Sequence, residues 1–259
     1  CAWQARTGAH ASVFIAERNP YYWKVDTQGN QLPYIDRIEM TLVQSAETVT
    51  LKAIAGEIDM QGRRVNFEDY PLLMEHRKTG DYRILRWQSA ATGQGTIYLN
   101  QNYRHVDPVM ADLLENQKFR QALSLGVNRK QIIDMFFMGV VESRQVVPLD
   151  NSLYGVPGTD TLFTSHDPER ANRILDEIGL AERDGSGFRL RPDGQRLKFT
   201  IAGFTPGTQY VDVAELVAMH WRELGIHATV KPEDRILWVV RATAGEHAVS
   251  VYAASGGFK

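Results

Sequence analysis

The last third of the chain alternates short apolar runs with amphipathic helical patterns. The order predicts strands at 197–201, 226–230 and 248–252, with helices at 211–224 and 235–244 between them. Strands that alternate with helices in this way form a parallel sheet through right-handed crossovers. This pattern constrains the fold more than any other feature of the sequence, because it predicts an α/β class for this part of the chain.

An alternating run at 96–102 precedes a helix-rich segment and follows a separate mixture of strand and helix patterns. In a strand, the side chains of Thr96, Tyr98, Asn100 and Asn102 would share one face, which would carry a row of hydrogen-bonding groups. We interpret this run as a crossover strand between two lobes. The alternative is a half-buried strand inside a single domain.

The crossover divides the chain into three expected parts. Residues 1–92 are the later part of a first lobe, residues 93–102 are the crossover or hinge strand, and residues 103–259 are the first part of a second lobe. A chain of 259 residues is long enough for two ordinary domains.

The expected first lobe contains several short elements. The patterns predict strands at 12–17, 38–43, 57–60 and 82–87, and helices that begin after Ser45 and Asn66. The alternation of Ile38, Met40 and Leu42 with polar residues predicts that the second of these strands has one buried face.

Capping residues mark the helices of the expected second lobe. Side chains that favour the helix N-cap precede each apolar stripe, at Asp107, Asn116, Asn128 and Asp167. Pro192-Asp193-Gly194 predicts a hairpin turn further along the chain. Five basic residues surround this hairpin, and we interpret them as a solvated, charge-protected edge rather than a polyanion site: Arg183, Arg189, Arg191, Arg196 and Lys198.

Composition excludes several function classes. The chain is 43% hydrophobic and 23% charged, with a formal net charge of −2. A balance this close to neutral argues against a general nucleic-acid binder and against attachment to membranes by charge. No stretch reaches the apolar length of a membrane span. The one cysteine, Cys1, can form no internal disulfide.

Catalytic motifs are missing from the sequence. The seven histidines are scattered, and only His220 and Glu223 fall on one helical face, which we interpret as an exposed face rather than a metal site. The sequence has no nucleophile elbow, phosphate-binding loop or dinucleotide fingerprint. We therefore expect no catalytic residue, metal or cofactor. The alternative of another class is a hydrolase fragment whose catalytic residues lie outside this chain.

Recognition is the remaining chemistry. The candidate ligand-binding residues lie at or near the ends of elements, where α/β folds form clefts: Tyr98, Asn100, Asn102, Trp238, Arg241 and Tyr252. Aromatic faces and amide groups suit a peptide and a sugar equally. For Trp238, a place in the core is the competing interpretation.

Six segments of the chain form a recognisable series in order and spacing. They are ERNPYYW at 17–23, LPYID at 32–36, AGEID at 55–59, FRQALS at 119–124 with Asn128-Arg129, DPERAN at 167–172 with LDEIGL at 175–180, and the stretch from Glu246-His247 to Gly256-Gly257. In these segments the chain resembles the extracellular solute-binding proteins of family 5, the receptors of bacterial ABC importers for peptides, dipeptides, nickel and oligosaccharides. The resemblance covers nearly the whole chain.

The resemblance implies a periplasmic-binding-protein type II-like fold with two lobes, of which this chain holds only parts. It implies a peptide-like ligand, or alternatively an oligosaccharide, captured between the lobes and delivered to the transmembrane subunits of an ABC permease. A monomer in a periplasmic or other extracytoplasmic location is expected. Ala248 departs from the family, since many relatives carry an acidic residue there, and this puts in doubt any ligand role at that position.

Both ends of the chain are expected to be cut. Family members are longer, with a signal peptide and further segments on both sides, so the resemblance implies a central piece. A first-position cysteine is compatible with the lipid anchor of a bacterial lipoprotein. Trp3 and the apolar run at 12–16 argue against it, because they are typical of a folded interior.

Overall fold

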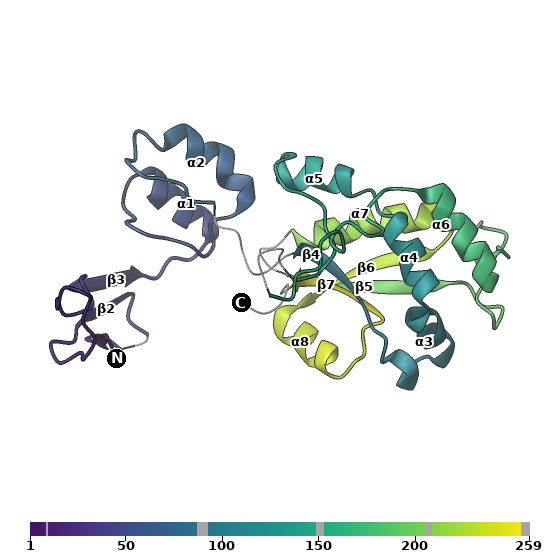
Figure 1. Cartoon of the computed structure of the whole chain (residues 1–259), viewed down its shortest axis with the longest axis horizontal. Coiled ribbons are helices and arrows are strands. Elements are labelled where there is room, and N and C mark those ends of the chain that lie inside the picture. The colour runs from purple at the N-terminus through teal and green to yellow at the C-terminus, as the bar shows by residue number, and fades with distance from the viewer. Residues whose placement is uncertain (9, 87–92, 149–152, 206–208, 255–259) are drawn as a thin grey trace. The chain divides into compact units, whose positions relative to one another are not determined.

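The computed structural model describes all residues except 9, 87–92, 149–152, 206–208 and 255–259 (Figure 1). The chain divides into two compact units, Cys1–Arg86 and Trp87–Lys259. Among the described residues, no helix is both long enough and apolar enough to cross a bilayer.

The first unit contains a small antiparallel sheet and a pair of helices. The sheet has the order β1-β2-β3, so that β2 pairs with both neighbours. The elements are β1 (Trp3–Ala5), β2 (Val13–Arg18), β3 (Arg37–Thr41), α1 (Ala46–Ile54), the 3-10 helix η1 (Phe67–Asp69) and α2 (Tyr70–His76).

Helix α1 begins and ends where its sequence predicts. The Ser45 hydroxyl accepts the Thr48 backbone N–H at 3.3 Å, and Gly56 follows the helix with a φ of 73°. The strand expected at 57–60 is absent. The Glu57 N–H instead donates to the Lys52 carbonyl at 2.9 Å, so this segment completes the helix end rather than entering a sheet.

The strand expected at 82–87 is also wrong over its described part, residues 82–86. The backbone N–H of Tyr82 donates to the Arg77 carbonyl at 3.1 Å, and the Tyr82 hydroxyl donates to the Leu73 carbonyl at 2.5 Å. These groups satisfy the C-terminal carbonyls of α2. Tyr82 therefore completes the end of α2 rather than opening a strand.

The buried face expected for β3 is mostly exposed, and Ile38 is its one half-buried member. Met40 is 54% exposed, and Leu42, just beyond the strand, is 76% exposed. Strand β3 lies at the edge of its sheet, and helices α1 and α2 pack against each other rather than covering it. Alternation predicted the strand correctly, but burial depends on a covering layer that the sequence pattern does not specify.

The second unit is built around a four-stranded sheet in the order β4-β7-β5-β6. Strand β5 pairs in parallel with β6 and β7, and β4 pairs antiparallel with β7. Helices α7 and α8 lie on opposite faces of the sheet (Figure 1). The predicted succession of strand, helix, strand, helix and strand is thus confirmed.

The elements of this unit follow the expected order with small shifts at their ends. They are β4 (Gly93–Leu99), the 3-10 helix η2 (Tyr103–His105), α3 (Pro108–Glu115), α4 (Gln117–Leu125), α5 (Arg129–Phe137), α6 (Pro168–Leu175), the π-helix η3 (Asp176–Leu180), β5 (Lys198–Thr205), α7 (Tyr210–Glu223), β6 (His227–Asp234), α8 (Arg235–Thr243) and β7 (Val249–Ala254). The segment expected as a crossover strand forms β4, and its role as a hinge stays a prediction.

Four predicted N-caps are confirmed. Each side-chain oxygen accepts a backbone N–H from the first turn of its helix, which satisfies a donor that has no partner within the helix. The pairs are Asp107 with Met110 at 3.0 Å, Asn116 with Lys118 at 2.9 Å, Asn128 with Gln131 at 3.0 Å and Asp167 with Arg170 at 2.9 Å.

Trp221 anchors α7 between the sheet and the preceding helices. Its side chain is 2% exposed, its ring meets Phe199 of β5 edge-on at 5.4 Å, and its Nε1–H donates to the Leu123 carbonyl at 2.9 Å. Burial of a large apolar side chain contributes about 1.5–3 kcal/mol. This one residue therefore joins β5, α7 and α4 into a single core.

Arg189 overturns part of the solvated-edge interpretation of the basic cluster. Its side chain is 1% exposed, with the guanidinium donating to the Leu224 carbonyl at 2.8 Å and to Asn172 Oδ1 at 2.7 Å, and pairing with Asp176. Arg191 is also largely buried, between Asp107 and Asp193. Both arginines hold the hairpin against the helices instead of facing water.

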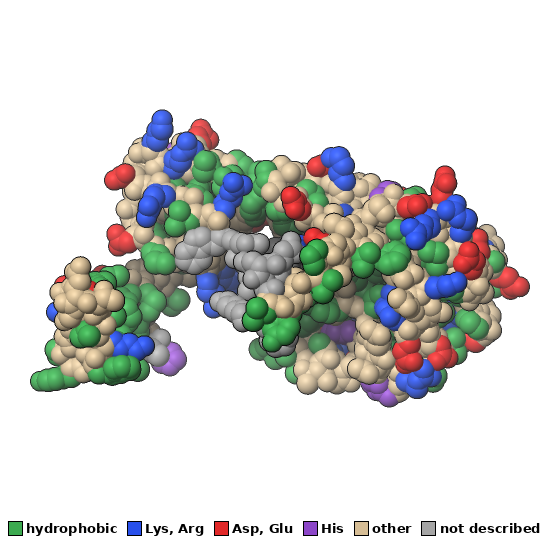
Figure 2. Space-filling model, viewed as in Figure 1, with side chains coloured by type: hydrophobic (Ala, Val, Ile, Leu, Met, Phe, Trp, Pro, Cys, Tyr) green, Lys and Arg blue, Asp and Glu red, His purple; other side chains and the backbone are tan. Residues whose placement is uncertain are grey.

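The remaining surface charge of the second unit is mixed. Figure 2 shows acidic and basic side chains interspersed over this unit on the face drawn. Arg196 pairs with Asp184 at 2.5 Å, and Lys198 is exposed at the start of β5. Interspersed charges of both signs keep the local potential small, which does not favour a polyanion.

His220 is buried, which corrects the expectation of an exposed helix face. It is 3% exposed, and its Nε2 lies 2.8 Å from Gln131 Oε1. Burial lowers the pKa of His220 below its ordinary value of 6.5, although the charge of Glu223 opposes this shift. The neutral ring donates to the Gln131 oxygen and ties α7 to α5.

The free energy of unfolding should therefore fall as the pH drops below about 6.5. Because the folded pKa of His220 lies below the unfolded value, protonation favours the unfolded chain. The contribution of this group is complete above the unfolded pKa and is lost as the pH falls toward the folded pKa. Urea unfolding at pH 7.5 and 5.5 measures the loss, which should be smaller in His220→Gln. An equal loss in both proteins would contradict this assignment.

Candidate functional site

Four aromatic side chains gather where the parallel strands of the second unit end. We call Phe204, Tyr210, Trp238 and Tyr252 the edge aromatic cluster. Phe204 lies near the end of β5, Tyr252 near the end of β7, Tyr210 opens α7 and Trp238 lies in α8. Phe204 lies 5.5 Å from both Trp238 and Tyr252 and 5.8 Å from Tyr210, measured between ring centroids. Such pairs make a stiff apolar wall at this edge.

Tyr98 reaches the same wall from the antiparallel strand β4. Its hydroxyl donates to the Ala253 carbonyl at 3.1 Å, while 41% of the residue remains exposed. Partial burial, with a smaller effect of neighbouring Tyr252, raises the pKa of Tyr98 above its ordinary value of 10, and burial does the same at Tyr210. Both of these hydroxyls thus stay protonated near neutral pH.

Trp238 is the most deeply buried contact between α8 and the other aromatic side chains of the cluster. It is 9% exposed, and its Nε1–H donates to the Ala202 carbonyl in β5 at 3.1 Å. Its ring also packs against Tyr252 at 5.5 Å. The competing interpretation of Trp238 as a core residue describes its position better than direct exposure to a ligand does.

Arg241 belongs to a charged network beneath the wall. It pairs with Glu233 and, at 2.8 Å, with Glu246, while Glu233 also accepts from His247 Nε2 at 3.0 Å. Glu233 and His247 are both buried. The two carboxylates already neutralise the Arg241 cation. The network therefore fixes the C-terminal turn of α8 against β6 and the segment that leads into β7.

The two buried members of the network have shifted pKa values. Burial alone raises the pKa of Glu233, but the hydrogen bond from His247 and the charge of Arg241 outweigh it and hold the pKa below its usual range. Burial lowers the pKa of His247 below 6.5, against the opposing effect of Glu233. Near neutral pH the pair is therefore a carboxylate and a neutral imidazole.

The amides of Asn100 and Asn102 lie beyond the end of β4. The Asn100 side chain donates to the carbonyls of Gly245 and His247, each at 3.0 Å, and its oxygen accepts the backbone N–H of Asn102 at 2.9 Å. Asn102 lies in a turn, so it does not continue the row of strand side chains. The Asn100 side chain thus holds the loop that precedes β7. A ligand role for either amide stays a prediction.

Arg235 is a residue that the sequence analysis missed. It is the first residue of α8, whose N-terminus is capped by Asp234 through the Ile236 N–H at 2.8 Å. Its guanidinium lies 5.7 Å from the centroid of the Phe204 ring, a cation–π distance, and the residue is exposed. Within the described part of the chain, no acidic side chain pairs with Arg235.

Arg235, Phe204 and Tyr210 share a signal that could have found them. Each lies at or just after the C-terminal end of a parallel strand, where α/β sheets place ligand clefts. The described residues contain no group of three or more histidine, cysteine, aspartate or glutamate side chains that could hold a metal ion. The site therefore offers one cation, an apolar wall and hydroxyl donors.

Comparison with known proteins places the chain in a family. The family model described as "Bacterial extracellular solute-binding proteins, family 5 Middle" matches residues 9–259. The periplasmic alpha-galactoside-binding protein of Rhizobium meliloti is 29% identical over 193 residues, which are 71% of this chain and 27% of that protein.

Solved structures show the same fold. An oligopeptide-binding protein OppA superposes with a TM-score of 0.68 and 38% identity, covering 98% of this chain and 40% of that one. MelB of Agrobacterium fabrum C58, solved in complex with stachyose, gives a TM-score of 0.68 at 22% identity, covering 97% and 39%. The fold is that of the two-lobed type II periplasmic binding proteins, and the chain spans less than half the length of these relatives. It belongs to the bacterial extracellular solute-binding proteins of family 5.

Proposed function

We propose that this chain is part of a receptor that captures a peptide-like solute outside the cytoplasm and delivers it to the permease of an ABC importer. The observation that carries the proposal is the edge aromatic cluster, with the unpaired Arg235 beside it, at the carboxyl edge of the parallel strands. The receptor acts by binding, without a catalytic step, as a monomer.

A peptide matches the chemistry of this edge. The free guanidinium of Arg235 complements a carboxylate, which a peptide carries at its C-terminus and on acidic side chains. The Tyr210 hydroxyl can donate to a peptide carbonyl, and the Tyr98 hydroxyl, whose proton is given to the Ala253 carbonyl, can accept a peptide N–H. The aromatic wall offers apolar contact to side chains. A single peptide could therefore make an ionic contact, hydrogen bonds and apolar contacts with this edge at the same time.

An oligosaccharide is the second candidate. The alpha-galactoside-binding relative and the stachyose complex of MelB show that the family includes sugar receptors. Exposed tyrosine rings such as Tyr98 suit the apolar faces of sugar rings, and tyrosine hydroxyls suit sugar hydroxyls. A neutral sugar leaves Arg235 without a counter-ion, and for that reason we rank it second.

The expected mechanism is closure of two lobes around the solute. Residues 93–102 serve as the hinge strand of the intact receptor, with 1–92 on one lobe and 103–259 on the other. A ligand that contacts both lobes stabilises only the closed form and so shifts the population toward it. The permease then recognises the closed form.

A direct titration tests this function. The intact protein is titrated with a peptide library and with an oligosaccharide panel that includes stachyose, while tryptophan fluorescence is recorded. Saturable responses to peptides alone support the first candidate, and responses to sugars alone support the second. Failure of both classes to give a response would contradict a solute receptor of either kind.

Tyr98→Ala should weaken ligand binding in the intact protein about tenfold while changing the free energy of unfolding by a smaller amount. The ring is partly exposed beside the wall, so its loss removes contact area with a ligand more than core packing. Tyr98→Phe keeps the ring and loses only the bond to the Ala253 carbonyl. An unchanged dissociation constant in Tyr98→Ala would remove this residue from the site.

A further inference from the structure

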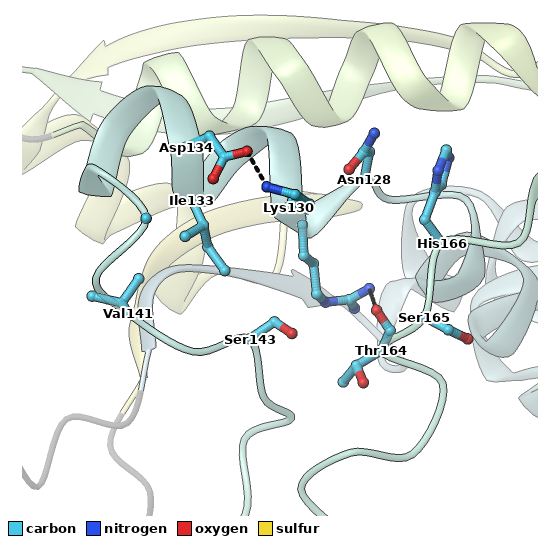
Figure 3. Close-up of a pocket in the computed structure, with 11 residues that line it drawn as sticks. Asn128, Lys130, Ile133, Asp134, Val141, Ser143, Thr164, Ser165 and His166 are labelled. Carbon is cyan, nitrogen blue, oxygen red and sulfur yellow. Dashed lines mark hydrogen bonds and ion pairs between the residues drawn. The ribbon is translucent and has the colours of Figure 1, made fainter.

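A cavity of about 390 Å³ lies beside α5, in the second unit. It is bounded by the first turns of that helix and by two segments of the long connection from α5 to α6, one at the start of the connection and one at its end. Figure 3 shows Ser143 and Thr164 on these facing segments, with Ile133 and Asp134 on the helix. The lining residues are Asn128, Arg129, Lys130, Ile133, Asp134, Gly139, Val141, Ser143, Thr164, Ser165 and His166.

Arg129 places a largely enclosed cation in this wall. Its Nη1 donates to the Ser124 carbonyl at 2.8 Å and to the Thr164 carbonyl at 3.3 Å, and its Nη2 donates to the Ser124 hydroxyl at 2.7 Å. These three bonds hold the guanidinium in one place. They also leave the Nε–H and one Nη2–H without a protein acceptor among the described residues, and Nε is not sealed from solvent.

The charge of Arg129 has no protein counter-ion in the described structure. All three of its acceptors are uncharged, and no carboxylate pairs with it. The acid on the cavity wall, Asp134, is already paired with Lys130 at 2.5 Å. Burial without a compensating charge lowers the pKa of Arg129 to about 10. A cation enclosed in this way is stabilised when an anion approaches it.

Hydroxyl groups complete the donor set. Within the described residues, the side chains of Ser143 and Ser165 have no hydrogen-bond partner, and both line the cavity. His166 adds an exposed imidazole at the rim, where its ring lies 6.2 Å from that of His220. Guanidinium and hydroxyl donors around one space are the groups with which proteins hold carboxylate and phosphate oxygens.

We propose that this cavity is a second binding site, for a small oxyanion that carries a carboxylate or phosphate group, with Arg129 as the charge partner and Ser143 as a donor. The site shares no residue with the edge aromatic cluster, so it goes beyond the receptor function and does not depend on it. The volume is large enough for a small organic anion, and the fixed guanidinium is preorganised to meet it.

Thermal unfolding of the intact protein tests the site with inorganic phosphate and with acetate as separate probes, at an ionic strength held constant with sodium chloride. We expect at least one probe to raise the melting temperature saturably, and the larger shift to identify the preferred group. Isothermal titration calorimetry should give one site per chain. Arg129→Gln should weaken binding at least tenfold.

Ser143→Asp is the second variant, because loss of Arg129 also removes its ties to Ser124 and Thr164. Ser143 and Arg129 line the same cavity, so a carboxylate at position 143 would supply the missing negative charge there. This protein should melt at a higher temperature than wild type and lose the response to added anion. Lys198→Gln, which removes an exposed cation far along the chain at the start of β5, is the charge-matched control and should keep the full response. Absence of a shift with both probes, or an undiminished shift in Ser143→Asp or Arg129→Gln, overturns the proposal.

Discussion

Replacement of Arg189 by alanine is expected to lower the free energy of unfolding by about 3–5 kcal/mol, the range for breaking a buried, charged hydrogen-bond network. The guanidinium donates to the carbonyls of Leu224 and Leu180 and to the side chains of Asn172 and Asp176. Its loss leaves two buried carbonyl groups without donors and a cavity where the side chain lay. Urea unfolding, followed by circular dichroism, measures the change.

Arg196→Ala is the matched control on the same hairpin. Arg196 pairs with Asp184 at the surface, with 36% of its side chain exposed, so its removal should cost no more than about 1 kcal/mol. Similar losses in both variants would contradict the structural role of Arg189, because they would place the two arginines in equivalent environments.

Arg235→Ala should weaken the binding of peptides with a free carboxylate by about 10–100-fold in the intact receptor. Hydrogen bonds to charged groups contribute about 1.5–3 kcal/mol, which corresponds to this range of affinity. The exposed guanidinium beside Phe204 makes no ion pair with the described residues, so its removal should cost little stability. Calorimetric titration with the tightest peptide of the library measures the effect.

The chemistry of the ligand gives an internal control for this prediction. Amidation of the peptide's carboxyl group should weaken its binding to the wild-type receptor and make little further difference in Arg235→Ala, because both changes remove the same interaction. Arg235→Lys should retain part of the affinity. Independent, additive losses from amidation and from Arg235→Ala would show that the arginine acts elsewhere.

Local signals in the sequence predicted most of the second unit. Asp107, Asn116, Asn128 and Asp167 cap their helices because each short polar side chain satisfies an N–H only a few residues away. The same locality explains the two failed strands. The patterns at 57–60 and 82–86 resemble strands, but the first N–H of each segment, at Glu57 and Tyr82, donates to a carbonyl at the end of α1 or α2.

The structure brings only some of the predicted site residues together at one edge of the sheet. Tyr98 and Tyr252 lie at the aromatic edge as expected by their positions in strands, whereas Arg241 is neutralised by Glu233 and Glu246. The sequence did not identify Arg235 as a candidate, because no local pattern distinguishes it from other arginines near the starts of helices. Its significance lies in its position over Phe204 and in its lack of a partner.

The sequence by itself determined the order of the elements in the second unit, the α/β class and the family, because capping, periodicity and segment order are properties of neighbouring residues. Only the tertiary structure decided which polar groups are buried. Arg189, His220 and Arg129 appear in the sequence as ordinary surface charges, and each is enclosed by residues far along the chain. Residues distant in the sequence determine whether a charged side chain faces water, a carboxylate or an open cavity. This environment determines whether the side chain stabilises the fold or is available to bind a ligand.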